Sequence, residues 1–345
     1  MTLELVLAGS ILIALTFYAL MGGADYGAGV WSLLARGRLA HEQRELIAAA
    51  IGPIWEANHV WLILVVTILF TAFPAAFALI TTTLHIPLTL LLMGVVLRGS
   101  AFAFRTNDVA SRSELSEWAQ IFWERVFALS SLITPVLLGV TIGAIASGRL
   151  GSARGGFVDV FVKPWLAPFP LMVGLLALAL FALLAAVYLI LETTRQELRE
   201  EFRRHALWAA VGSAVLAVIV LALAHTGAPE VGQELSQSLW GRVVLASAGL
   251  FGLCALLFLW IRRFRLARVC AVGEVALVLW GWALGQYPYL VEPTLTIYNA
   301  AAPAQTLRLL LVALLLGAIA LFPSLYYLYR IFKGRALFGQ ARGKS

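Results

Sequence analysis

Two acidic side chains lie within strongly apolar stretches of this sequence. Asp25 is in the segment GGADYGAG (22–29), and Glu56 is in the segment GPIWEANHVW (52–61). An ionisable group at membrane depth costs a few kcal/mol, so it usually faces a bundle interior or water and has a function. Proton transfer is the chemistry that such carboxyl groups can perform. Asp25 and Glu56 are therefore our first candidate proton carriers.

Polar and aromatic side chains surround Glu56. Glu56 and His59 are three positions apart and Trp55 and His59 are four apart, so on a helix each pair shares a face. Pro53 removes a backbone donor and can free a carbonyl group for water. The two segments together predict a proton path made of Asp25, Glu56, Asn58 and His59.

Simpler roles remain open for these residues. Asp25 and Glu56 can each pair with a cation or a backbone group and merely lock helices together. His59 can be a hydrogen-bonded packing residue, and a haem-ligand role for His59 or His85 is the less favoured alternative. Glu274 lies near a basic stretch, where we expect a capping charge or an ion-pair partner.

Two arginines follow the third apolar stretch. Arg98 and Arg105 are seven positions apart and share one helix face. Their side chains can reach lipid headgroups, or they can hold an anion or a carboxylate of a partner. The sequence leaves both alternatives open.

The composition excludes a soluble globular protein. Of 345 residues, 61% are hydrophobic and only 12% are charged, and the mean hydropathy is +0.91. The net charge of +7 does not indicate a nucleic-acid partner, because the basic residues lie in short loops rather than on one folded face. Cys254 and Cys270 lack metal-ligand spacing, and no soluble-enzyme motif is present, so we expect no metal site.

Nine apolar runs are long enough to cross a bilayer, which requires about 20 residues. Their approximate limits are 4–34, 47–72, 76–98, 119–146, 165–191, 206–224, 241–261, 269–290 and 306–330. We therefore expect an all-α integral membrane protein with nine transmembrane helices. The connections are too short for a soluble domain, so residues 1–345 form a single transmembrane domain.

The basic residues predict the orientation of this domain. Alternate connections hold 20 of the 25 lysines and arginines, which places those connections in the cytoplasm, the N-terminus outside and the C-terminus in the cytoplasm. Asp25 is nine residues before Leu34, and Glu56 is nine after Ile47. At the helical rise per residue, both carboxylates lie about 13 Å from the cytoplasmic ends of their helices and can meet at one level.

The apolar segments resemble subunit II of the cytochrome bd-type quinol oxidases. The resemblance covers essentially the whole chain and is carried, in the expected order, by GADYGAG (23–29), GPIWEANHVW (52–61), RGSAFAFR (98–105), WGWALGQYPYL (280–290) and FPSLYYLY (322–329). It implies a first four-helix bundle (1–147), a second four-helix bundle (164–291) and a peripheral ninth helix (305–331). The basic connections 36–46 and 192–205 hold similar places in the two halves, which permits this division.

The resemblance also implies a function within a complex. A pseudo-symmetric partner, subunit I, would carry the quinol site and ligate two b-type haems and one d-type haem. This chain would hold no axial haem ligand. It would stabilise subunit I and line a cytoplasmic proton path to the haems, where O2 is reduced to water. Trp55 and Glu56 match the tryptophan–acid pair near the partner's haem, although many members of the family have Asp at the position of Glu56.

The resemblance implies the surroundings of the chain as well. We expect a multi-pass protein of the bacterial inner membrane, in contact with lipid. A small accessory subunit and a structural quinone or lipid bound in this chain are further possibilities. This chain would interact with quinol and O2 only as part of the complex.

A proton-coupled secondary transporter is the competing hypothesis. Such a protein would also carry membrane carboxylates and proline-interrupted helices. It would normally show inverted repeats and paired broken helices, which we do not find in the sequence. A structural subunit without chemistry of its own is the third alternative.

Overall fold

The computed structural model describes residues 2–51, 55–111, 117–151 and 155–338. Within these ranges, nine helical segments are long and apolar enough to cross a membrane, which confirms the predicted fold class. The first span is Leu3–Leu34 and is built from α1 (Leu3–Phe17), the π-helix η1 (Tyr18–Gly22) and α2 (Gly23–Leu34). The amphipathic α3 (Ala40–Ile51) follows it.

The remaining elements follow in chain order. They are α4 (Trp55–Ala72), α5 (Pro74–Thr83), α6 (His85–Ser111), α7 (Glu117–Ala146), α8 (Phe157–Phe161), α9 (Pro168–Glu192), α10 (Gln196–Gly227), α11 (Pro229–Gln237), α12 (Leu239–Trp260), α13 (Phe264–Gln286), β1 (Tyr289–Val291), β2 (Leu295–Thr296) and α14 (Ala304–Phe338). The two short strands pair in an antiparallel hairpin. All the long elements are helices because a chain in lipid must satisfy its backbone hydrogen bonds internally.

The third predicted span was wrong in its limits. Residues 76–98 were expected to form one helix, but the chain breaks at Leu84 between α5 and α6, and the spanning segment is His85–Phe104. Pro87 explains the break, because its ring lacks an N–H and clashes with the carbonyl four residues earlier. His85 sits at the break, where its Nδ1 lies 2.9 Å from the carbonyl oxygen of Thr82.

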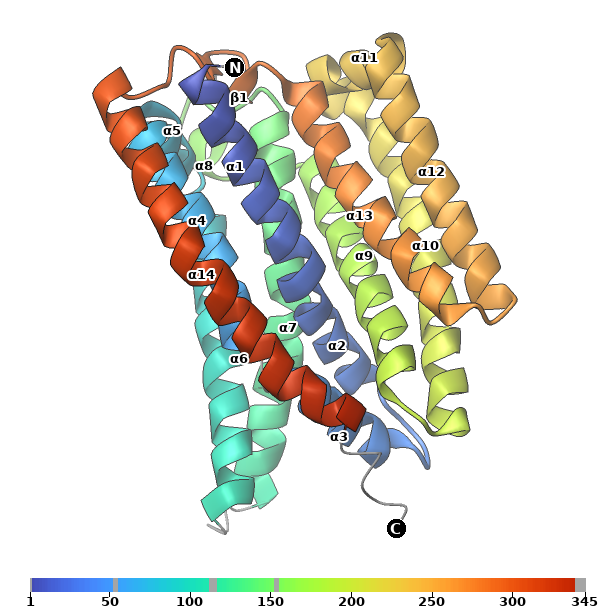
Figure 1. Cartoon of the computed structure of the whole chain (residues 1–345). Coiled ribbons are helices and arrows are strands. Elements are labelled where there is room, and N and C mark those ends of the chain that lie inside the picture. Colours follow the sequence, from blue (N-terminus) through green and yellow to red (C-terminus); the bar gives the residue numbers. More distant parts are fainter. Residues whose placement is uncertain (1, 52–54, 112–116, 152–154, 339–345) are drawn as a thin grey trace.

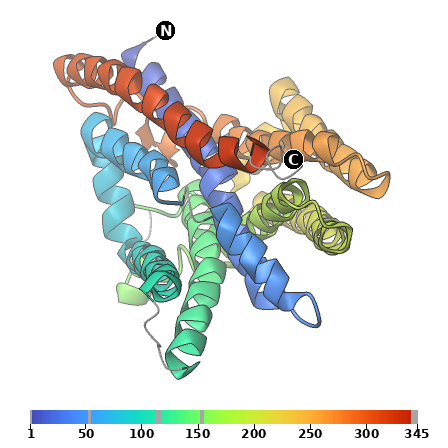
Figure 2. The same ribbon diagram turned by 60° about the horizontal axis from the view of Figure 1, so that its bottom comes forward.

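The long helices run side by side (Figure 1). Helix α9 packs against α2, α7 and α10, and α12 packs against α13. Helix α14 crosses obliquely over α1 and α4 as an outer helix, and the view of Figure 2 shows the same oblique course. The division into two bundles and the orientation in the membrane remain predictions.

The contact between α2 and α9 depends on glycine. A Cβ atom added at Gly27 would lie 2.0 Å from the carbonyl oxygen of Phe181. Small residues let transmembrane helices approach this closely, since lipid-embedded helices associate through packing rather than through exclusion of water. The largest buried cluster lies along this contact and includes Trp31, Leu183 and Ile190. Asp25 lies two residues from Gly27, so the helix contact holds it in place.

Candidate functional site

Asp25 is buried at the start of α2, directly after the π-helix. Its side chain is 6% exposed, and its Oδ2 accepts a hydrogen bond of 2.5 Å from the amide nitrogen of Asn58. Asn58 lies on α4 and is 1% exposed. The structure therefore brings together two of the predicted path residues, and it links α2 to α4 through them.

Arg98 supplies a positive charge beside this pair. Its Nη2 donates to the backbone carbonyl of Asp25 at 2.9 Å, and its Nε donates to Ser131 Oγ at 3.2 Å. The guanidinium also lies over the ring of Tyr26, 4.6 Å from its centre, and 5.3 Å from the centre of Phe127. Arg98 is 3% exposed, so it does not reach the membrane surface as the headgroup alternative required.

Glu56 has a different environment from Asp25. It lies on the exposed surface of α4, whereas Asp25 is buried. We considered that the two carboxylates could meet at one level. Among the described residues, however, the α4 residue that bonds to Asp25 is Asn58 rather than Glu56. The depth estimate failed to show this because it gives the level of a residue but not the side of the helix on which it lies.

Trp55 and His59 lie beside Glu56 on α4 and are both half-buried. Their rings meet edge to face with centres 6.0 Å apart, and Trp55 also packs against Phe102 of α6. Arg105 belongs to α6, but its side chain lies outside the described residues. The predicted contact of Arg105 with an anion or a partner remains a prediction.

Two tyrosines complete the buried cluster, and the sequence analysis missed them. The hydroxyl groups of Tyr18 and Tyr26 lie 3.1 Å apart, and the two side chains are 3% and 1% exposed. Tyr18 opens the π-helix, and helices of this kind often occur at functional sites. A signal was available, since a phenol in a transmembrane helix needs a hydrogen-bond partner and Tyr26 adjoins Asp25.

Glu274 was expected to be a capping charge or an ion-pair partner, but it lies inside α13 and pairs with no cation among the described residues. It is buried on α13, and its Oε1 lies 3.1 Å from where a Cβ of Gly252 on α12 would be. Its Oε2 has no hydrogen-bond partner in the part of the chain that the structure describes. The glycine on the neighbouring helix makes the room that lets this carboxyl group turn inward.

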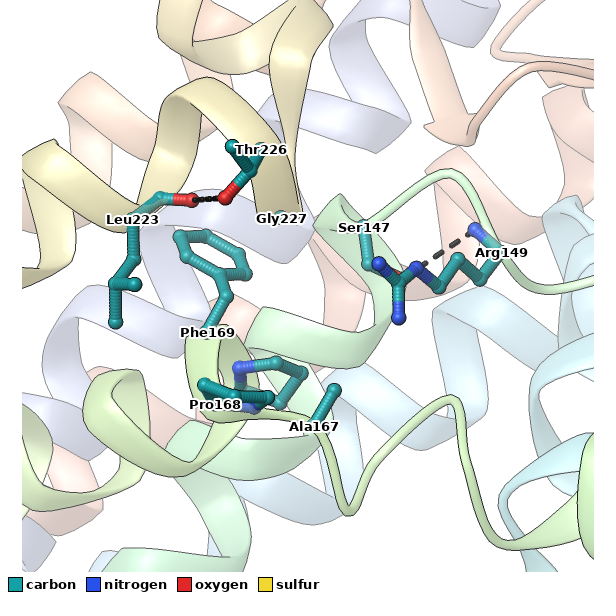
Figure 3. Close-up of a pocket in the computed structure, with 9 residues that line it drawn as sticks. Ser147, Arg149, Ala167, Pro168, Phe169, Leu223, Thr226 and Gly227 are labelled. Atoms are coloured by element: carbon teal, nitrogen blue, oxygen red, sulfur yellow. Dashed lines mark hydrogen bonds between the residues drawn. The ribbon is translucent and has the colours of Figure 1, made fainter.

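A cavity of about 230 Å³ lies at the ends of α7, α9 and α10, away from the Asp25 cluster. Figure 3 shows the ring of Phe169 and the guanidinium of Arg149 beside it. Its lining is mainly apolar and comprises Ser147, Arg149, Ala167, Pro168, Phe169, Pro170, Leu223, Thr226 and Gly227. The guanidinium of Arg149 has no hydrogen bond or ion pair within the described ranges.

Several histidines already have contacts within this chain. His59 packs on Trp55, His85 lies against the Thr82 carbonyl and His205 stacks on Trp31 with ring centres 4.5 Å apart. The absence of an axial haem ligand in this chain remains a prediction.

Comparisons with known proteins identify the family of this chain. The family model described as cytochrome bd terminal oxidase subunit II matches residues 3–332. A Bacillus subtilis chain described as a cytochrome bd menaquinol oxidase subunit II is 24% identical over 91% of this chain and 91% of its own length. The cytochrome bd-I ubiquinol oxidase subunit 2 of Escherichia coli is 28% identical over 54% of this chain and 47% of its own length.

A solved structure shares the fold. The bd oxidase from Geobacillus thermodenitrificans includes a chain that matches with a TM-score of 0.78 at 25% identity, over 96% of this chain and 99% of that one. The resemblance predicted from the five segments is thus confirmed, and these matches do not support the transporter alternative. The match of the family model over residues 3–332, in agreement with nine spanning helices in the described part of the chain, shows that this chain belongs to the cytochrome bd terminal oxidase subunit II family.

Proposed function

We propose that this chain is subunit II of a quinol oxidase in a bacterial inner membrane, and that its buried polar cluster carries protons toward the site of O2 reduction. Family membership supports the role in the complex. The observation that carries the proton path is the bonding of Asp25 to Asn58 beside Arg98. An amide can hold a membrane-embedded carboxyl group in place, and a nearby cation stabilises its ionised form, so that the group can release a proton at membrane depth.

The side chains have separable tasks in this proposal. Asn58 donates to the Asp25 carboxylate and fixes its direction, while Arg98 stabilises its negative charge. Asp25 holds the exchangeable proton. Glu56 and His59, on α4, pass protons at the exposed side of the helix.

Subunit I is the partner that we expect against α4. Glu56, Ile63 and Phe70 recur every seven residues on this helix and are all exposed, and Glu56 is an ionisable residue in an apolar segment. A carboxylate facing lipid is costly, whereas one facing a protein partner can be solvated there. We call Glu56, Ile63 and Phe70 the α4 stripe and propose that it faces subunit I.

The oxygen chemistry belongs to haems that we expect in subunit I. Bound haem supplies electron transfer and O2 reduction, and Trp55 and Glu56 would lie on the side of this chain that faces it. The role of this chain is then to deliver protons and to support the partner. Oxidation of quinol would release protons at the outer face, whereas the protons consumed in water formation would come from the cytoplasm. Charge would thus cross the membrane without a pump.

The cavity near Arg149 is our proposed place for a structural lipid or quinone. Its apolar lining suits an acyl or isoprenoid chain, and the guanidinium suits a polar head. This role is structural and separate from the proton path.

Substitution of the two carboxylates tests the proton path. We expect Glu56→Gln to slow O2 reduction about tenfold or more and to disturb haem content, since its amide cannot donate and accept protons in turn. Asp25→Asn should slow turnover with haem content retained. Quinol-driven oxygen consumption and the haem absorption spectrum of the purified complex are the measurements.

Glu45→Gln is the matched control. Glu45 is an exposed acid on α3 that pairs only with His41 among the described residues, so its loss should leave turnover unchanged. Normal turnover and normal haem spectra in both Glu56→Gln and Asp25→Asn would rule out the proposed path.

A further inference from the structure

The buried hydroxyl pair of Tyr18 and Tyr26 has no role in the proton path as described so far. Two phenols bonded to each other at 3.1 Å lie inside the first span, at 3% and 1% exposure. Phenylalanine would be sufficient for apolar packing alone. Tyrosine adds a hydroxyl group, and a hydroxyl group that is removed from water must be compensated by a hydrogen bond. The pair therefore calls for an explanation beyond packing.

One end of the pair adjoins the aspartate cluster. Tyr26 follows Asp25 directly, and the Arg98 guanidinium that bonds to the Asp25 carbonyl lies 4.6 Å from the centre of the Tyr26 ring. A cation over the ring stabilises any negative charge that develops on the Tyr26 oxygen during proton transfer.

The other end of the pair reaches α4. The Tyr18 ring lies 6.2 Å from the His59 ring, measured between ring centres. His59 is half-buried and is three residues from the exposed Glu56, on the same side of α4. The polar atoms of neighbouring rings can be joined directly or through one water.

We propose that Tyr26 and Tyr18 form a relay that carries protons from the Asp25 cluster to His59 on the α4 side that bears Glu56. This inference rests on the proposed function and adds an order to its residues. A proton released by the Asp25 carboxyl group binds to the Tyr26 oxygen, and the Tyr26 hydroxyl proton passes to the Tyr18 oxygen. The Tyr18 hydroxyl proton then passes to the unprotonated ring nitrogen of His59. Each phenol keeps one proton throughout, and no electron moves.

The π-helix makes this arrangement possible. Tyr18 and Tyr26 are eight residues apart, and the wider turn at Tyr18–Gly22 lies between them. An extra residue in a helical turn rotates all the preceding side chains relative to the following ones. In this chain the rotation accompanies a direct contact between the two hydroxyl groups.

Single substitutions by phenylalanine test the relay. Tyr18→Phe and Tyr26→Phe keep both rings and the surface under Arg98, but they remove the transferring oxygen. We expect each to lower oxygen-reduction turnover per haem by about tenfold and to raise the solvent hydrogen/deuterium isotope effect, because proton transfer becomes more rate-limiting. The assay uses the purified two-subunit complex, with turnover divided by the haem absorbance of the same sample.

Tyr188→Phe is the matched control. Tyr188 donates to the backbone carbonyl of Leu20 in the same π-helix, so this variant removes a nearby phenol without breaking the Tyr18–Tyr26 bond. Its turnover per haem and isotope effect should equal those of the unmodified complex. An equal fall in all three variants would mean that the phenols only support packing.

The outcomes also separate this inference from the proposed function. Slow Asp25→Asn and Glu56→Gln complexes with unchanged Tyr18→Phe and Tyr26→Phe complexes would overturn the relay and leave the wider path standing. Unchanged turnover in all four variants would overturn both. Slow turnover in all four, with a raised isotope effect in Tyr18→Phe and Tyr26→Phe and an unchanged one in Tyr188→Phe, supports the relay.

Discussion

Single residues in this chain show how a charge is accommodated inside a membrane protein. Arg98 is almost fully buried, yet each interaction that surrounds it suits a planar cation: a carbonyl oxygen, a serine hydroxyl and two aromatic rings. Lysine could not match this set, because its ammonium group is compact and cannot stack or donate in a fixed plane. The buried carboxyl group of Asp25 beside it is bonded to Asn58.

Glu292 is a further buried acid, and it lies outside the spanning helices. It lies in the connection between β1 and β2 and is 1% exposed, and burial, with a smaller effect of Glu230, raises the pKa of its carboxyl group to about 7. The folded chain therefore binds this proton more tightly than the unfolded chain does. Stability falls as the pH rises from the ordinary glutamate pKa toward 7 and stays at the lower level above it.

We expect Glu292→Gln to remove this pH dependence. The variant should be more stable than the unmodified complex at pH 8, by at most about 3 kcal/mol, and no more stable near pH 4.5. Thermal unfolding of the detergent-purified complex at both pH values is the measurement. Glu234→Gln, an exposed acid on α11, is the control, and an equal gain in both variants would contradict the explanation.

At the scale of elements, the approach of α2 to α9 decides where Asp25 lies. Ala at Gly27 would place a methyl group 2.0 Å from the Phe181 carbonyl oxygen, a backbone atom that cannot move aside cheaply. We expect Gly27→Ala to cost at least the 1–3 kcal/mol or so that is usual for overpacking and to reduce the yield of assembled complex. Gly9→Ala is the matched control, since nothing lies within 4 Å of its added Cβ.

The yield is measured as haem-containing complex per unit of membrane protein. A Gly27→Ala complex that assembles and turns over normally would show that the two helices can separate without loss. The position of Asp25 would then depend on its bond to Asn58 rather than on the helix contact.

The whole molecule has large apolar surfaces, and only some of them can face lipid. Ile63 on the α4 stripe and Leu253 on α12 are 63% and 68% exposed. Lipid is fluid and adapts to a larger side chain, whereas a protein partner is packed and does not. Ile63→Trp should therefore reduce co-purification of subunit I several-fold, while Leu253→Trp should have little effect.

Co-purification of the two subunits in mild detergent, followed by their stoichiometry, checks this prediction. An equal loss of subunit I in both variants would indicate general misfolding. Full retention in both would place the partner on another face of the chain.

The sequence alone determined the fold class, the family and the residues that bear charge in lipid. Long apolar runs leave no alternative to helices in a bilayer, and the segments around Asp25 and Glu56 are distinctive enough to identify the family. The limits of the third span were wrong because the apolar pattern continues through Leu84, where Pro87 interrupts the hydrogen bonding.

Only the tertiary structure decided which side chains meet. Spacing along one helix predicts shared faces, but it does not show which face turns toward which neighbour, so Asn58 rather than Glu56 bonds to Asp25. The same holds for Arg98, which turned inward, and for the Tyr18–Tyr26 pair across the π-helix. Rotation of each helix about its axis is set by packing between distant segments, and the sequence of a single helix does not contain that information.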